Sequence, residues 1–147
     1  MGLFFKKPNS IEQSEISTLI YNVQTSYRYM HDWCGVEIFV DCKKNVFDDI
    51  NKLIKYESKY PSFFKHPTPS ENKQKVISEL PYVEKKYIDN LIVYIEKKLL
   101  NYSTDRGKRN NFNKEADKFR YYAGEFLPET VDYFNKVARK NFSDYIE

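Results

Sequence analysis

The residues best suited to metal or redox chemistry in this chain lie in one short stretch, HDWCGVEIFVDC, at residues 31–42. The stretch contains both cysteines, the single tryptophan and one of the two histidines of the sequence. Thiolate and imidazole groups are ligands that zinc prefers in proteins. The stretch and the second histidine therefore offer a candidate metal site, whose members are His31, Asp32, Cys34, Cys42 and His66.

The spacing of these residues differs from that of compact zinc sites. Such sites carry paired ligands such as C-x2-C, whereas here two residues separate His31 from Cys34 and seven separate Cys34 from Cys42. A free cysteine commonly packs as a small buried hydrophobic residue. We therefore expect both cysteines to lie in the core, together with Trp33 and Ile38, and we expect no cofactor.

The dipeptide His31-Asp32 resembles the central His-Asp pair of the HD phosphohydrolases, an all-α family of metal-dependent enzymes. The resemblance implies a metal-dependent phosphohydrolase in which His31, Asp32 and His66 would take part. Members of that family also carry a histidine earlier in the chain, and no histidine precedes His31 here. Such a hydrolase is accordingly an alternative function that is carried by one dipeptide.

Motifs of nucleophilic and nucleotide-binding enzymes are missing from the sequence. It contains no G-x-S-x-G elbow, no P-loop and no G-x-G-x-x-G. Cys34 follows His31 by three residues, which would place a thiol and an imidazole on one face of a helix. No group that could form an oxyanion hole is identifiable beside them. We therefore assign no catalytic residue.

Composition indicates a small globular protein. The chain has 147 residues, of which 41% are hydrophobic and 31% charged, with a net charge of +3. No stretch approaches the roughly 18 apolar residues of a membrane span, and the start MGLFFKKPNS lacks the apolar region of a signal peptide. These features predict a cytoplasmic protein with reduced thiols. Abundant Lys, Asn, Ile, Tyr and Phe indicate an AT-rich genome, bacterial or phage.

Apolar residues recur at steps of three and four along most of the chain, the pattern of amphipathic helices. The pattern predicts one all-α domain of about six helices over residues 1–147, joined by short turns at Pro and Gly, with residues 1–10 flexible or loosely packed. The expected helices cover residues 16–30, 46–59, 69–80, 82–102, 112–122 and 128–145.

Four local signals set the expected helix ends. Asn45 is a plausible N-cap for the second helix, and Thr68-Pro69-Ser70-Glu71 reads as a capping box that begins the third. Pro81 is expected to turn the chain in a new direction. Residues 103–111, STDRGKRNN, are expected to form a loop that pivots at Gly107.

Residues 36–40, VEIFV, are β-branched and could form a strand. A strand must pair, because unpaired buried backbone groups are costly. The only other candidate strand is the short run Leu3-Phe4-Phe5. We therefore favour a helix that extends the preceding apolar stripe and is bent or broken at Gly35.

The strongest charge pattern lies between Lys97 and Arg120, where eight basic residues accompany only Asp105, Glu115 and Asp117. Tyrosine and phenylalanine are interleaved with these basic residues. Cations for phosphates beside rings for stacking are typical of a nucleic-acid surface. The candidate contacts are Arg106, Lys108, Arg109, Lys114, Lys118 and Arg120.

Residues 119–137, FRYYAGEFLPETVDYFNKV, resemble the tail of a bacterial family that hydrolyses 5-bromo-4-chloroindolyl phosphate. The resemblance implies only that Pro128 opens a last amphipathic helix.

Aromatic residues make up 17% of the chain, an unusually high share that composition bias and core packing can explain. Tyrosine and phenylalanine could also mark a binding surface, because aromatic rings dominate the energetics of interfaces. The sequence therefore favours a small regulatory or interaction protein that binds another protein through an aromatic-rich surface. Nucleic-acid binding through residues 97–120 and the metal-dependent hydrolase remain alternatives, and a second copy of the chain could cover one helix stripe.

Overall fold

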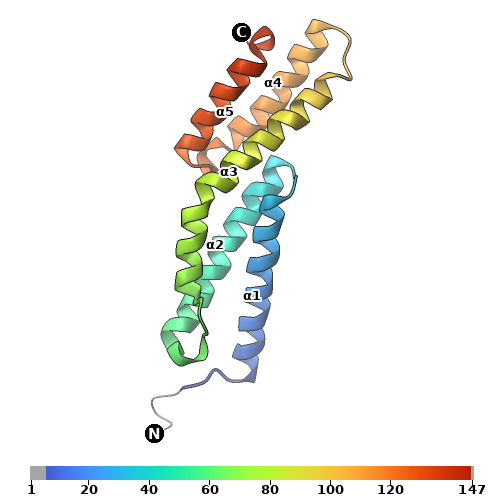
Figure 1. Cartoon of the computed structure of the whole chain (residues 1–147). Coiled ribbons are helices and arrows are strands. Elements are labelled where there is room, and N and C mark those ends of the chain that lie inside the picture. The colour runs from blue at the N-terminus through green and yellow to red at the C-terminus, as the bar shows by residue number, and fades with distance from the viewer. Residues whose placement is uncertain (1–5, 147) are drawn as a thin grey trace. The chain divides into compact units, whose positions relative to one another are not determined.

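The structure is a computed structural model that describes residues 6–146, and all its regular elements are helices (Figure 1). The predicted all-α class is confirmed, and no strand occurs in that range. The count of about six was wrong, since residues 6–146 form five α-helices. They are α1 (Ser10–His31), α2 (Val36–Lys59), α3 (Pro69–Leu99), α4 (Asp105–Tyr121) and α5 (Pro128–Asn141), with the short 3-10 helices η2 (Pro61–Phe63), η3 (Ala123–Glu125) and η4 (Ser143–Tyr145).

Helix α3 accounts for the difference in number. The capping box predicted at its start is present, because the backbone N–H groups of Thr68 and Glu71 each donate to the other residue's side chain. The helix then continues through Pro81, where we expected one helix to end and the next to begin. A proline inside a helix costs about 3 kcal/mol. Burial of apolar side chains on both sides of Pro81, among them Leu80 and Val83, offsets this cost.

Helix α4 begins earlier than expected, and DRGKRNN is helical rather than a loop. The hydroxyl of Thr104 accepts a hydrogen bond from the N–H of Gly107 at 3.0 Å, which caps the helix. Asp105 lies in the first turn, where an anion is favourable. These two residues outweigh the low helix propensity of the glycine.

The stretch at residues 31–42 is helical at 36–40, as favoured, but it is not one bent helix. Helix α1 ends at His31, residues 32–35 are not helical, and α2 begins at Val36. The N–H of Phe39 donates to the carbonyl of Gly35 at 3.0 Å and closes the first turn of α2. Asn45 therefore lies inside α2, and its predicted role as an N-cap was wrong.

The chain forms two compact units. Unit 1 comprises Met1–Asp32 and Asp41–Leu80, and unit 2 comprises Trp33–Val40 and Pro81–Glu147. Both α2 and α3 contribute residues to each unit. The single domain over residues 1–147 stays a prediction.

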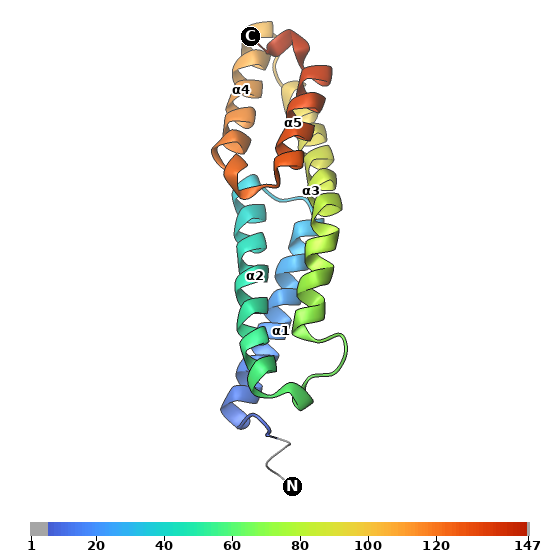
Figure 2. The ribbon, with the colours of Figure 1, turned by 90° about the vertical axis from the view of Figure 1, so that its left-hand side faces the viewer.

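In unit 1, α1 lies beside α2 and the first part of α3, as Figures 1 and 2 both show. Ile16 and Leu19 of α1 pack against Leu53 of α2 in a buried cluster. The hydroxyl of Tyr27 on α1 donates to Glu79 of α3 at 2.8 Å. Apolar packing and one polar contact thus join the three helices.

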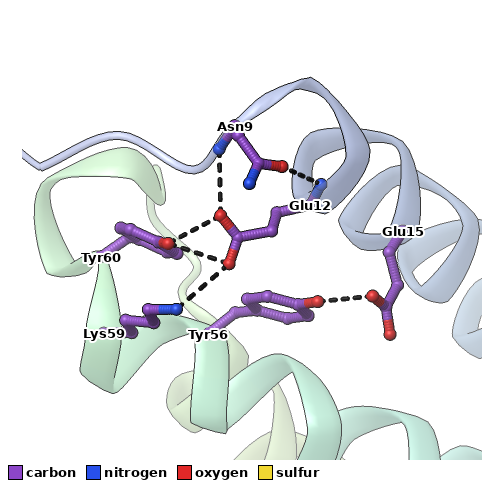
Figure 3. Close-up of polar contacts among 6 residues, drawn as sticks. All are labelled: Asn9, Glu12, Glu15, Tyr56, Lys59 and Tyr60. Atoms are coloured by element: carbon purple, nitrogen blue, oxygen red, sulfur yellow. Dashed lines mark hydrogen bonds and ion pairs between the residues drawn. The ribbon is translucent and has the colours of Figure 1, made fainter.

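Polar contacts also join the start of α1 to the end of α2 (Figure 3). Asn9 and Glu12 form a capping box, and Glu12 also accepts from the hydroxyl of Tyr60 at 2.7 Å. The hydroxyl of Tyr56 donates to Glu15 at 2.5 Å. The hydrogen bond from Tyr60 is the main cause that lowers the pKa of Glu12.

The flexible or loosely packed N-terminus predicted for residues 1–10 lies partly outside the described residues. Within them, Pro8 is buried and Asn9 caps α1.

In unit 2, the second part of α3 packs with α4 and α5 around aromatic side chains. Phe112 and Phe119 of α4 and Phe134 of α5 are fully buried. The rings of Phe119 and Phe134 lie 4.2 Å apart, centre to centre. Pro128 occupies the first position of α5, as the sequence indicated.

None of the helices within residues 6–146 combines the length and the hydropathy that a membrane span requires.

Candidate interaction surface

The side chain of Trp33 is held at the surface of unit 2 by other rings. Its indole stacks on Tyr87 at 5.7 Å between ring centres and packs against Tyr94 at 4.8 Å. The hydroxyl of Tyr87 donates to the carbonyl of Cys34 at 2.9 Å and so fixes the backbone next to the indole. Trp33 nevertheless remains 43% exposed. It is an ordered aromatic side chain that is open to solvent.

The ring contacts continue from Tyr87 into the core of unit 2. Phe39 stacks on Tyr87 at 4.3 Å and on Phe126 at 5.4 Å. Phe126 packs against Phe119 at 5.0 Å. Each such pair of rings stabilises the fold by about 0.5–1.5 kcal/mol, in addition to the effect of removing apolar surface from water. The aromatic core therefore supports both Trp33 and the first turn of α2.

A groove runs between that first turn and the second half of α4. Its volume is about 660 Å³, and its lining includes Val36 and Ile38 of α2 and Lys114, Lys118 and Tyr121 of α4. The side chain of Ile38 is 55% exposed and that of Tyr121 is 81% exposed. Large apolar and aromatic groups thus face solvent from both walls.

A smaller recess of about 170 Å³ adjoins this groove, with Gly35, Val36 and Lys118 in the lining of both. Trp33 and Tyr94 line the smaller recess. We call the two recesses together the Trp33–Tyr121 groove. Trp33 and residues 35–38 therefore form one wall of this groove.

Glu115 organises the charges beside the groove. Its carboxylate is buried and lies 2.6 Å from the Nζ atom of Lys98 and 3.6 Å from that of Lys118. The hydrogen bond to Glu115 raises the pKa of Lys98. Lys114 makes no ion pair with any residue from 6 to 146. It is therefore the cation of the groove that is left for an external anion.

The basic residues predicted from the sequence divide into two groups. Lys114 and Lys118 line the groove, and nearby Arg120 pairs with Asp117 at 3.2 Å. Arg106, Lys108 and Arg109 lie in the first two turns of α4. At 1.5 Å per residue, Arg109 is about 14 Å along the helix axis from Lys118. All are exposed except Lys108, which is half-buried.

The candidate metal ligands are not brought together. Nδ1 of His31 lies 2.8 Å from the carbonyl of Tyr27, and exposed His66 is bonded to Glu71. Exposed Asp32 is the C-cap residue of α1. Cys34 is half-buried and Cys42 is buried. Between residues 6 and 146, no three His, Cys, Asp or Glu side chains are placed to hold a metal ion.

The expectation that the whole stretch packs inward was partly wrong. Cys42 is buried as predicted, but Trp33 and Ile38 are exposed. Phe39 and Val40 take their place in the core. The non-helical residues 32–35 shift the helical phase, so that the apolar stripe of α1 does not continue into α2.

A buried carboxylate in unit 2 was also missed. Glu84 is fully buried, and its Oε1 atom accepts from the N–H of Leu127 at 2.9 Å and from the hydroxyl of Thr130 at 2.6 Å. It thus caps the start of α5 from α3. Only its position next to buried Val83 on α3 could have indicated this.

The chain matches no protein-family model, no curated protein and no solved structure. Its functional interpretation therefore depends on the geometry of its own residues.

Proposed function

We propose that this chain is a small helical interaction protein that binds another protein through the Trp33–Tyr121 groove. The observation that carries the proposal is the exposure of Trp33, Ile38 and Tyr121 around a concave surface. Tryptophan and tyrosine are the residues most enriched among those that dominate binding energy. Exposed hydrophobic residues clustered around a recess are typical of interaction sites.

The rigidity of one groove wall supports the same function. Trp33 is stacked on Tyr87, which is itself hydrogen-bonded to the backbone of Cys34. A side chain that is ordered before binding loses less conformational entropy when the partner arrives. The partner would place an apolar side chain between Ile38 and Tyr121 and a carboxylate beside Lys114.

A cytoplasmic location belongs to the same proposal. It is supported by the small number of cysteines, since two are too few for the disulfide framework that is typical of small secreted proteins.

Site-specific cross-linking in the native host tests the groove and captures its partner in one step. The photoreactive analogue p-benzoylphenylalanine replaces Tyr121 in one variant and Tyr82 in the other. Tyr82 is the matched control, since it is a tyrosine of unit 2 that is 65% exposed and lies outside the groove. We expect a discrete protein adduct from position 121 and none from position 82. Equal adducts at both positions, or adducts only with nucleic acid, would overturn the proposal.

Binding to the protein identified in this way is then measured with purified variants. Ile38→Ala and Tyr121→Ala each remove a mostly exposed side chain, so the fold is preserved. A loss of about 2 kcal/mol, the threshold for a dominant contact, weakens binding about 30-fold. Leu100→Ala is the control, because Leu100 is 79% exposed, directly follows α3 and does not line the groove.

If the cross-linked adduct contains a second copy of the chain, the partner of the groove is the protein itself.

A further inference from the structure

Unit 2 carries a second concentration of charge, separate from the groove. The end of α3, the start of α4 and the end of α5 lie at the same end of this unit in Figures 1 and 2. Helix η4, which follows α5, contacts α4, and the rings of Phe112 and Phe142 lie 4.9 Å apart. Residues far apart in sequence therefore meet here. We call this surface the basic end; its cations are Lys97, Arg106, Lys108, Arg109, Arg139 and Lys140.

The charge of the basic end is not balanced locally. Residues 96–109 and 136–146 together carry eight Lys or Arg and three Asp or Glu. None of the six cations of the basic end forms an ion pair with any residue between 6 and 146, whereas Lys98, Lys118 and Arg120 do so nearby. Carboxylates within residues 6–146 therefore do not balance these six charges.

Helix stability does not account for the cations of α4. The N-terminal end of a helix carries a partial positive charge, so cations in its first turns are unfavourable. Arg106, Lys108 and Arg109 occupy these turns. Arg139 and Lys140 lie in the last turn of α5, where cations are favourable. The three residues of α4 therefore indicate an external anion more strongly than those of α5.

Two rings accompany these cations. Tyr102 and Tyr145 are both half-buried, one in the turn before α4 and the other in η4. Tyr102 packs closely on the helix start, because a Cβ atom added to Gly107 would lie 3.4 Å from that of Tyr102. Partly exposed rings beside a row of cations suit unpaired bases next to a phosphate backbone.

From this arrangement we propose that the basic end binds the phosphate backbone of single-stranded nucleic acid. The proposal goes beyond protein binding through the groove and does not depend on it. It also goes beyond the basic segment at residues 97–120, because it requires Arg139 and Lys140 of α5. Arginine suits this role, since one guanidinium group can donate two parallel hydrogen bonds to the oxygens of a phosphate.

Fluorescence anisotropy with a labelled oligonucleotide of about 16 nucleotides, the upper end of the usual site size, measures the binding. Three double variants of the full chain are compared with the wild type at several salt concentrations. The first is Arg106→Ala with Arg109→Ala, and the second is Arg139→Ala with Lys140→Ala. The control is Lys55→Ala with Lys75→Ala, which removes the same charge from exposed sites of unit 1.

Each phosphate contact with a single strand contributes about 0.7 to the slope of log K against log[salt]. We therefore expect the first and second variants each to lower that slope by about 1.4 and to weaken binding roughly 25-fold near 0.1 M salt. The control keeps the wild-type slope, and circular dichroism confirms that all variants are folded. Tyr121→Ala binds the oligonucleotide like the wild type, which separates this surface from the groove.

Three results would overturn the proposal. The first is an equal loss of affinity in the control, since the binding would then follow net charge alone. The second is a normal slope in the variant of Arg139 and Lys140, because the basic end would then not act as one surface. The third is binding to vesicles of anionic phospholipid without binding to the oligonucleotide, which would assign the surface to a membrane.

Discussion

Glu84 provides the sharpest test of the packing in unit 2. The residue lies on α3 with no exposure to solvent, and its Oε1 atom accepts two hydrogen bonds at the start of α5. One donor is the N–H of Leu127, the N-cap residue of α5, whose own side chain makes no capping bond. The other is the hydroxyl of Thr130, which is also buried. The carboxylate therefore replaces the cap that the sequence of α5 does not supply.

The variant Glu84→Ala leaves both donors without this acceptor. A buried donor that loses its partner costs about 1–3 kcal/mol, so the two together cost about 2–6 kcal/mol. This is a large part of the roughly 5–15 kcal/mol that stabilises a typical domain. Glu84→Gln keeps an oxygen acceptor for both donors, so we expect a smaller loss than for Glu84→Ala.

Urea unfolding followed by circular dichroism gives the free energy of unfolding of each variant. Glu96→Ala is the matched control, because Glu96 is an exposed carboxylate of the same helix, and we expect a change within about 0.5 kcal/mol. Thr130→Val completes a double-mutant cycle with Glu84→Ala, in which each single variant removes the hydrogen bond between the two side chains, and should show a coupling of about 1 kcal/mol. A loss for Glu84→Ala as small as that for Glu96→Ala would refute the reasoning.

Two further predictions concern the titration of Tyr56 in unit 1 and the substitution of Gly107 at the start of α4. The hydrogen bond to Glu15 raises the pKa of Tyr56 to about 12, above the usual value near 10. This hydrogen bond therefore stabilises the fold fully below about pH 10, and the stabilisation is lost as the pH rises toward 12. Tyrosinate absorbance, taken as the difference from Tyr56→Phe, should show this midpoint, and Glu15→Gln should lower it. Gly107→Ala brings a Cβ atom to 3.0 Å from Oγ1 of the capping Thr104, so a loss of about 1 kcal/mol in urea unfolding is expected. Gly35→Ala meets no atom within 4 Å and should be nearly neutral; an equal loss in both variants would contradict this account.

Periodicity was sufficient to predict the helices but not always where they end. The capping box at Thr68 and Glu71 was readable because its partners are three residues apart. Pro81 was misinterpreted because its local cost is visible in the sequence, whereas the burial on either side that offsets it is not. The early start of α4 was signalled by Thr104 and Asp105, which received less weight than Gly107.

The groove could not be predicted, because it depends on contacts between segments far apart in sequence. Trp33 is exposed only because α1 ends at His31 and three residues then pass without helical structure before Gly35. Its position is set by Tyr87 and Tyr94, which follow it by more than fifty residues. The abundance of aromatic residues indicated an interaction surface without locating it.

The basic surface is the feature that closeness in sequence predicted least well. The excess of cations between residues 97 and 120 appeared to be one surface, but Lys98 and Lys118 are bound to buried Glu115. Both ammonium groups are therefore held beside a carboxylate of unit 2. Arg139 and Lys140, in contrast, lie outside that segment and reach the same end of the unit through the packing of η4 on α4. A charged surface is therefore defined by the cations that remain after internal carboxylates are satisfied, and only the folded arrangement of α3, α4 and α5 shows which these are.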